Sequence, residues 1–177
     1  MSEIVQKGAV VLKTRTRPVL HFSSQALNTL ILEMADALFK QADGIGIAAP
    51  QIGKSAQVFL VTSDVLNLNK LNARIKTRTE KKTAVAFSED DYMVFINPAI
   101  LKQSRKQVSD MEGCLSVRGI YGNVVRPEKV TIEYFDEHGK KNTRGASGLF
   151  ARVLQHEIDH LNGILFVDKA KNVRKLT

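Results

Sequence analysis

A helical pattern that is apolar on almost every side constrains the fold of this chain more than any other feature. The pattern begins after Ser147, a suitable N-cap, and ends at Gly163, a suitable C-terminal stop. Its apolar residues lie on two sides: Phe150, Leu154, Ile158 and Leu161 on one, and Leu149 and Val153, together with His156 and His160, on the other. A helix without a polar face is buried in a core. The sequence therefore predicts that other elements enclose this helix.

The elements expected elsewhere are strands and one further helix. Residues 23–42 repeat apolar side chains at helical spacing. Three segments read as strands: 57–62, then 92–98, which is stopped by Pro98, and 129–140, which alternates apolar and polar side chains. Because strands precede and surround two helices, the pattern favours the α+β class.

The chain carries no internal repeat and no linker, so residues 1–177 are expected to form a single catalytic domain. Residues 63–90 are polar and rich in Lys and Thr, and we expect them to be a basic surface insert that takes no part in the chemistry. Within this insert, residues 66–83 hold six basic side chains against Glu80 alone, a large share of the net charge of +8. Such a cluster is usually solvated, and attraction to a polyanion is the alternative. No nucleic-acid motif or aromatic platform lies beside it, so no specific nucleic-acid partner is predicted.

The sequence favours a cytoplasmic protein without a membrane partner. Its only cysteine cannot form an internal disulfide, which is typical of a reducing compartment. The apolar run near the N-terminus, AVVL, is too short for the core of a signal peptide. No stretch approaches the roughly 18 apolar residues of a membrane-spanning helix.

The predicted buried helix contains QHEIDHLNG, residues 155–163, in which His156 and His160 are four residues apart. On a helix this spacing places their Cβ atoms about 5–6 Å apart on one face, so both imidazoles can bind one metal ion. Glu157 can reach a water on that metal without binding the ion itself. Two surface histidines on an amphipathic helix are the alternative. Burial argues against it, because an orphaned buried polar group costs about 1–3 kcal/mol.

A third metal ligand is needed, because catalytic zinc-type sites usually have three protein ligands and one open position. Cys114, in EGCLS at residues 112–116, is the natural candidate. By type alone, a lone cysteine is a small buried hydrophobe, a nucleophile or a ligand. Leu149 and Val153 lie on the histidine side of the helix, where they can form an apolar recess beside the metal.

Three motifs in order give the chain a resemblance to peptide deformylases. They are GIGIAAPQ at residues 44–51, EGCLS at 112–116 and QHEIDHL at 155–161, supported by INP at 96–98 and GILFVD at 163–168. The resemblance covers most of the chain outside the insert and the extreme C-terminus. It implies β-sheets packed around a central buried helix that carries HExxH.

The resemblance also implies an activity, a cofactor and a set of site residues. The activity is removal of the N-formyl group from the starting methionine of nascent chains, with release of formate. The cofactor is one divalent metal ion, commonly Fe(II), for which Zn(II), Ni(II) or Co(II) can substitute. The implied ligands are Cys114, His156 and His160, and Glu157 is the implied general acid and base.

Further roles rest on the same resemblance. Gln51 and the backbone N–H of Leu115 match the groups that stabilise the oxyanion, and the peptide is expected to pair with Gly46, beside Ile45. The recess of Leu149 and Val153 is expected to hold the methionine side chain. Apart from the resemblance, Glu112 or Asp159 can accept a hydrogen bond from a ligand or from Arg126, and an ordinary solvated carboxylate is the alternative for each. The chain departs from the family at Arg118, where a proline is common.

The expected partners are nascent peptides that begin with formyl-Met. A weak contact with the ribosome through the basic insert or tail is also expected.

Three other functions fit parts of the pattern. GIGIAA matches a dinucleotide fingerprint, but it comes after a helix rather than a strand, and Pro50 interrupts the helix that the fingerprint requires next. An HExxH metallopeptidase is the main alternative, although the 17 residues after His160 contain no further His or Glu as third ligand. A structural metal site in an RNA-binding module is the non-enzymatic alternative, and it gives Glu157 no task.

Overall fold

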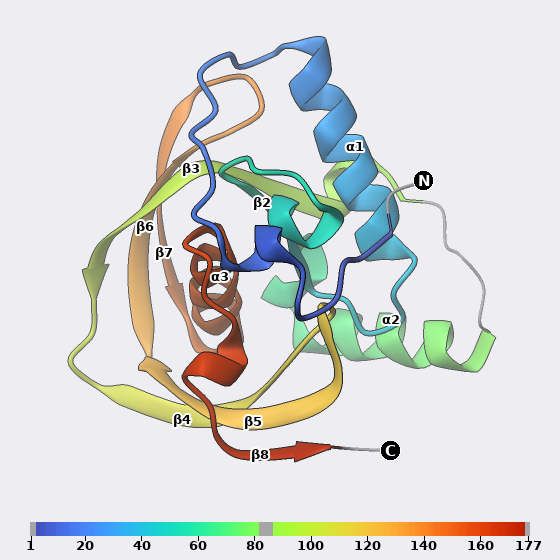
Figure 1. Cartoon of the computed structure of the whole chain (residues 1–177), viewed down its shortest axis with the longest axis vertical. Coiled ribbons are helices and arrows are strands. Elements are labelled where there is room, and N and C mark those ends of the chain that lie inside the picture. The colour runs from blue at the N-terminus through green and yellow to red at the C-terminus, as the bar shows by residue number, and fades with distance from the viewer. Residues whose placement is uncertain (1–2, 82–86, 176–177) are drawn as a thin grey trace.

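The computed structural model describes residues 3–81 and 87–175, so residues 82–86 of the predicted insert lie outside the described residues. Within these ranges the chain forms two antiparallel sheets and three α-helices, joined by short 3-10 turns (Figure 1). The predicted α+β class is confirmed. No helix in the described ranges is both long enough and apolar enough to cross a membrane.

The larger sheet has five strands in the order β1-β2-β3-β6-β7. Their bounds are Gly46–Ala48 for β1, Val58–Thr62 for β2, Tyr92–Gln103 for β3, Lys129–Phe135 for β6 and Lys141–Ser147 for β7. Strand β2 is buried at every position, because each of its faces packs against a different helix. Val58 and Leu60 join the core cluster of α1 (Gln25–Phe39), and Phe59 and Val61 join that of α3 (Gly148–Leu161).

The smaller sheet has the order β4-β5-β8, with bounds Gln107–Cys114, Val117–Pro127 and Lys171–Lys175. Strands β4 and β5 form a hairpin whose last paired residues are Cys114 and Val117. The register shifts between Gly113 and Cys114, so the pairing becomes irregular where the cysteine stands. The hairpin thus ends at the only cysteine of the chain.

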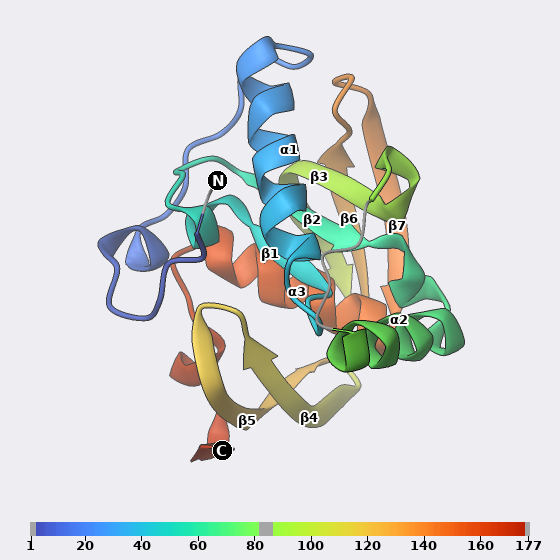
Figure 2. The same ribbon diagram turned by 90° about the vertical axis from the view of Figure 1, so that its right-hand side faces the viewer.

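Helix α1 confirms the helix predicted within residues 23–42. Ser24 is its N-cap, because its hydroxyl accepts a hydrogen bond from the Leu27 backbone N–H at 3.2 Å. One side of α1 packs on β1 and β2, as Figure 2 shows.

Helix α3 carries His156, Glu157 and His160, and 11 of its 14 residues are buried. Ser147 stands at its N-cap position but makes no side-chain capping bond. The helix contacts β1, β2, β6 and β7 of the larger sheet and β5 of the smaller one. Figures 1 and 2 show it lying between the two sheets. The histidine pair therefore lies where the two sheets approach each other.

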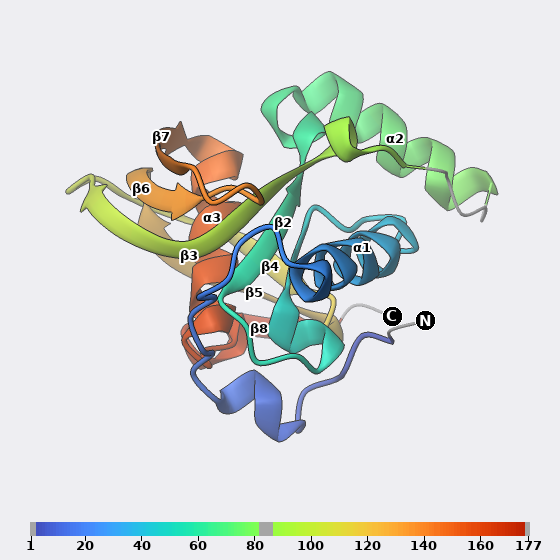
Figure 3. The ribbon, with the colours of Figure 1, turned by 90° about the horizontal axis from the view of Figure 1, so that it is seen from above.

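Two segments differ from the prediction. Residues 63–90, expected to be a surface insert, contain helix α2 (Leu68–Lys81), which Figure 3 shows beyond the edge of the sheet. Its Leu71 is only 2% exposed, so the insert also contributes to the packed interior. Strand β3 does not stop at Pro98 as predicted but continues to Gln103, through a register shift between Ile96 and Ala99. A bulge tolerates proline because the missing N–H is not needed there.

Candidate metal centre and active site

Helix α3 and the β4–β5 hairpin bring the three predicted ligands together. The His156 and His160 rings are 5.0 Å apart, centroid to centroid, as neighbours one helical turn apart must be. The Cys114 Sγ lies 3.2 Å from the His160 Nε2. One ligand atom from each of the three residues lies within 4.8 Å of the other two. The two histidines predicted from their spacing and the cysteine predicted as third ligand thus lie close enough to share one metal ion.

This donor set fits a divalent transition metal. The His156 Nδ1 lies 2.9 Å from the Glu112 carboxylate, which leaves the other ring nitrogen for the metal. In His160 it is Nε2 that faces the cysteine sulfur. One sulfur and two imidazole nitrogens suit Zn(II), Fe(II) and their neighbours, and leave room for a fourth ligand.

Glu112 organises the polar side of the centre. It is 6% exposed, and its two carboxylate oxygens accept hydrogen bonds from Arg126 at 2.6 and 2.8 Å and from Arg152 at 2.7 Å. Burial opposes its ionisation, but the hydrogen bonds from Arg126 and His156 outweigh burial and hold the pKa of this carboxyl well below its usual range. Glu112 therefore stays charged and fixes the His156 ring.

Asp159 extends the same network. It accepts from the Arg126 Nη1 at 2.8 Å and from the Lys169 Nζ at 2.6 Å. The expectation that Glu112 or Asp159 accepts hydrogen bonds from a ligand or from Arg126 is confirmed for both carboxylates.

Arg152 is a member of this network that the sequence reasoning missed. Its guanidinium donates to Glu112 and to the backbone carbonyls of Val124 and Val108, at 2.7 to 2.9 Å. It lies one helical turn before His156 and lines the same cavity. An arginine in a helix that is otherwise apolar was the available signal, since a buried cation needs a buried acceptor.

Glu157 lies on the other side of His156 and is nearly enclosed, with 3% of its surface exposed. Burial raises the pKa of its carboxyl from the ordinary 4.5 to about 7, and the charges of His156 and Arg126 only partly oppose this. Among the described residues, its Oε2 has no hydrogen-bond partner. A buried carboxyl with a pKa near neutrality and a free oxygen is suited to accept and return a proton.

Gln51 reaches the centre from a 3-10 turn, Ala49–Ile52, that comes directly after β1. Its Oε1 accepts from the Ala48 N–H at 2.8 Å, which turns its Nε2 toward the Cys114 sulfur at 3.5 Å. Because the amide oxygen is held in place, the N–H group that points at the centre is fixed in orientation.

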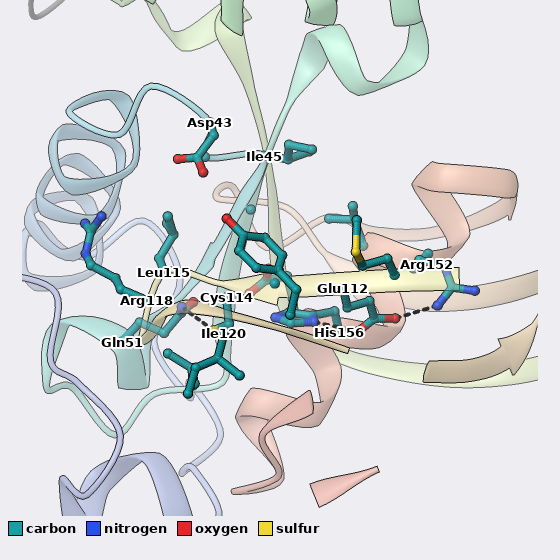
Figure 4. A pocket seen from close by; sticks show the side chains of 18 of the residues that line it. Asp43, Ile45, Gln51, Glu112, Cys114, Leu115, Arg118, Ile120, Arg152 and His156 are labelled. Carbon is teal, nitrogen blue, oxygen red and sulfur yellow. Dashed lines mark hydrogen bonds and ion pairs between the residues drawn. The ribbon is translucent and has the colours of Figure 1, made fainter. Parts of the chain in front are cut away.

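A cavity of about 280 Å³ joins these groups (Figure 4). Nine of the ten predicted site residues line it: Ile45, Gly46, Gln51, Cys114, Leu115, Leu149, Val153, His156 and Glu157. The tenth, His160, does not line the cavity. It is 1% exposed, and its Nε2 contacts the Cys114 sulfur. Arg118, which the sequence connected with the substrate-binding edge, also lines the cavity. Sequence reasoning assigned no wall role to several other lining residues: Asp43, Met111, Ile120, Tyr121 and Arg152.

Tyr121 explains the glycine next to the cysteine. A Cβ at Gly113 would lie 2.6 Å from the Tyr121 ring, which crosses the hairpin at that point. Only glycine lets this ring pack against the backbone and form part of the cavity wall. The glycine in EGCLS thus serves packing across the hairpin.

Comparison with known proteins identifies the family. The family model described as polypeptide deformylase matches residues 1–176. The chain belongs to the polypeptide deformylase family. Its members are metal-dependent hydrolases that remove the N-formyl group from nascent peptides, and the chain is an enzyme of this kind, as the three motifs predicted. The metallopeptidase alternative is not favoured.

Individual relatives agree with the family model. A peptide deformylase from Chlorobaculum parvum is 39% identical over 90% of this chain and 74% of its own length. One from Treponema pallidum is 38% identical over 95% and 87%. A solved peptide deformylase from Plasmodium falciparum superposes with a TM-score of 0.78 at 34% identity, covering 96% of this chain and 86% of that one. One from Legionella pneumophila gives 0.77 at 35% identity, over 96% and 85%.

Proposed function

We propose that Cys114, His156 and His160 bind one divalent metal ion, Fe(II) in the native protein, and that Zn(II), Ni(II) or Co(II) can replace it. The support is the donor set of one sulfur and two nitrogens within 4.8 Å. When bound, such an ion supplies Lewis-acid chemistry that makes water a nucleophile near neutral pH. We propose further that α3 is the central helix of this site and that residues 1–177 form one catalytic domain.

The chain's own residues carry the remaining steps. Glu157 accepts the proton of the attacking water at its free oxygen and then donates it to the amine that leaves the formyl carbon. Water adds to the formyl carbon, the C–N bond breaks, and the products are formate and a free N-terminal amine. The Gln51 Nε2–H and the Leu115 backbone N–H donate to the oxygen on which negative charge develops.

The cavity walls position the substrate. Leu149 and Val153 line it on the histidine side and form the apolar part of the recess for the methionine side chain. Gly46 and Ile45 also line the cavity, where an extended peptide can pair with the backbone of β1. Formyl is preferred to acetyl, because a methyl group would occupy the space from which water attacks.

Substrate and location result from this assignment. We propose that the substrates are nascent peptides that begin with formyl-Met and that the enzyme acts in the cytoplasm. A weak ribosome contact through the basic insert or tail stays a prediction.

The observation that carries the proposal is that residues from three separate motifs line one cavity around one ligand cluster. The test is release of formate and free amine from matched peptides: formyl-Met, acetyl-Met and an internally cleavable peptide without a formyl group. We expect formate from the first and little product from the other two. Cleavage of the internal peptide without formate release would instead favour the metallopeptidase.

A further inference from the structure

One wall of the cavity is a short backbone segment, Gly44–Ile45–Gly46, that enters strand β1. The sheet holds its second half. Gly46 pairs with Val61, and the Ile45 carbonyl accepts from the Thr62 N–H at 2.8 Å. Gly44 precedes the strand, so the ladder of β1 and β2 does not reach its carbonyl.

A side chain from helix α2 holds that carbonyl. The Arg74 Nη2 donates to the Gly44 carbonyl at 3.0 Å and lies 3.4 Å from the Thr62 Oγ1. Its Nε donates to the Asp64 carboxylate at 2.5 Å, and both side chains of this ion pair are only 16% exposed. One guanidinium therefore connects the pocket wall, the end of β2 and the turn after it.

The position of Arg74 is itself fixed. Helix α2 begins directly after the 3-10 turn Ser63–Leu66, and Asn67 caps it by accepting from the backbone N–H groups of Asn69 and Lys70. Leu71 buries one side of the helix. The capped helix start and the half-buried ion pair with Asp64 hold Arg74 so that its guanidinium reaches the Gly44 carbonyl.

We propose that Arg74 is a positioning residue for substrate binding, which holds the Gly44–Gly46 wall of the pocket in place. The inference rests on the proposed function of that wall, and it gives the basic insert a task in the enzyme. Segment 63–90 was expected to take no part in the chemistry, but its helix supports the strand on which the peptide lies. Only arginine has a planar group with enough N–H donors to bond the Gly44 carbonyl and the Asp64 carboxylate together.

The proposal predicts which kinetic constant changes. Glu157 and the three ligands belong to α3 and the β4–β5 hairpin, which Arg74 does not contact in any described hydrogen bond. Without Arg74 the Gly44 carbonyl is no longer held in place. A peptide that binds must then order this part of the wall, which weakens its binding. A substrate that has bound still meets an intact centre, so the loss falls on KM rather than on kcat.

The test compares Arg74→Met with Lys76→Met, a matched loss of one charge at an exposed position of the same helix. Three quantities are measured on metal-loaded protein: kcat and KM for formyl-Met-Ala-Ser, the affinity for unformylated Met-Ala-Ser, and hydrogen exchange of residues 44–48. For Arg74→Met we expect KM to rise about tenfold, kcat to stay within threefold, and exchange at 44–48 to become faster. Lys76→Met should match the wild type, and Arg74→Lys, which keeps the charge without the fork, should lie in between.

Equal KM and equal exchange in Arg74→Met and Lys76→Met would overturn the proposal. If Arg74→Met does not fold, Arg74→Lys decides, since unchanged KM and exchange in that variant exclude the clamp. The proposed function fails separately: if the wild type releases no formate, peptide affinity and exchange still report whether Arg74 holds the wall.

Discussion

Gly46 offers the sharpest test of the active-site geometry. A Cβ added there would lie 2.5 Å from the Glu157 Oε1 and 3.0 Å from its Cδ. Comfortable contact between such atoms begins at about 3.5 Å, so the overlap is about 1 Å. The backbone of Gly46 is not left-handed, so alanine introduces no strain of its own there. The steric overlap introduced by Gly46→Ala therefore falls on Glu157.

The magnitude depends on how little Glu157 can move. It is buried on helix α3, between the two sheets, and cannot swing into solvent. Overpacking a buried site costs about 1–3 kcal/mol, which lowers the melting temperature by about 2–4 °C per kcal/mol in a chain of this size. Displacing a proton-transfer group by about 1 Å costs about a hundredfold in rate. We expect kcat to fall about a hundredfold while the metal stays bound.

Gly145→Ala is the matched control, because no atom lies within 4 Å of a Cβ added at that position of β7. The assay is formate release by both variants, with metal content and thermal unfolding measured on the same samples. If Gly46→Ala retains kcat within threefold of Gly145→Ala, the reasoning that places Glu157 against this strand is refuted.

Three further predictions concern the centre itself. Cys114→Ala should lose tightly bound metal, measured as stoichiometry after purification, and undiminished metal would exclude Cys114 as a ligand. Glu157→Gln should keep its metal but lose at least a hundredfold in kcat. Because burial raises the pKa of Glu157 from 4.5 to about 7, ionising it costs the folded state, so metal-free wild type loses stability as the pH rises through this range. Glu157→Gln should therefore be more stable than wild type at pH 8, by on the order of 3 kcal/mol, and equal to it near pH 4, as urea unfolding can measure.

The elements that the sequence predicts well are those with a local signal. Helix α1 agrees with its apolar periodicity, and strand β2 with its short run of apolar side chains. The two histidines agree with a spacing of one helical turn. Cys114 was predicted from the need for a third ligand. The roles of Gln51 and Leu115 came only from family resemblance, because no spacing rule connects a 3-10 turn or a hairpin to a helix that lies far along the chain.

The elements that were missed have weak or misleading local signals. Strand β8 is exposed at every position, so no apolar alternation marks it. Helix α2 is polar and lies in a segment whose composition is typical of a loop, yet a cap at Asn67 and one buried leucine suffice to fix it. The roles of Arg74 and Arg152 depend on backbone carbonyls of other elements, which no local pattern reveals.

The two sides of α3 explain how one helix can hold its histidines at a fixed position relative to Cys114. Phe150, Leu154 and Ile158 belong to the core cluster beneath the larger sheet, and apolar packing of this kind tolerates small rotations about the helix axis.

Toward the smaller sheet the same helix presents Arg152, His156 and Asp159, which bond to Glu112, Arg126 and the carbonyls of β4 and β5. Buried ion pairs are weak evidence for stability, since their desolvation offsets much of their attraction. Their hydrogen bonds nevertheless fix the orientation of the helix, because hydrogen bonds weaken steeply as their angles change. Rotating α3 would break several of these bonds at once, and Glu112 lies two residues before Cys114 on the same strand. The network that orients His156 therefore also sets its distance from the sulfur ligand.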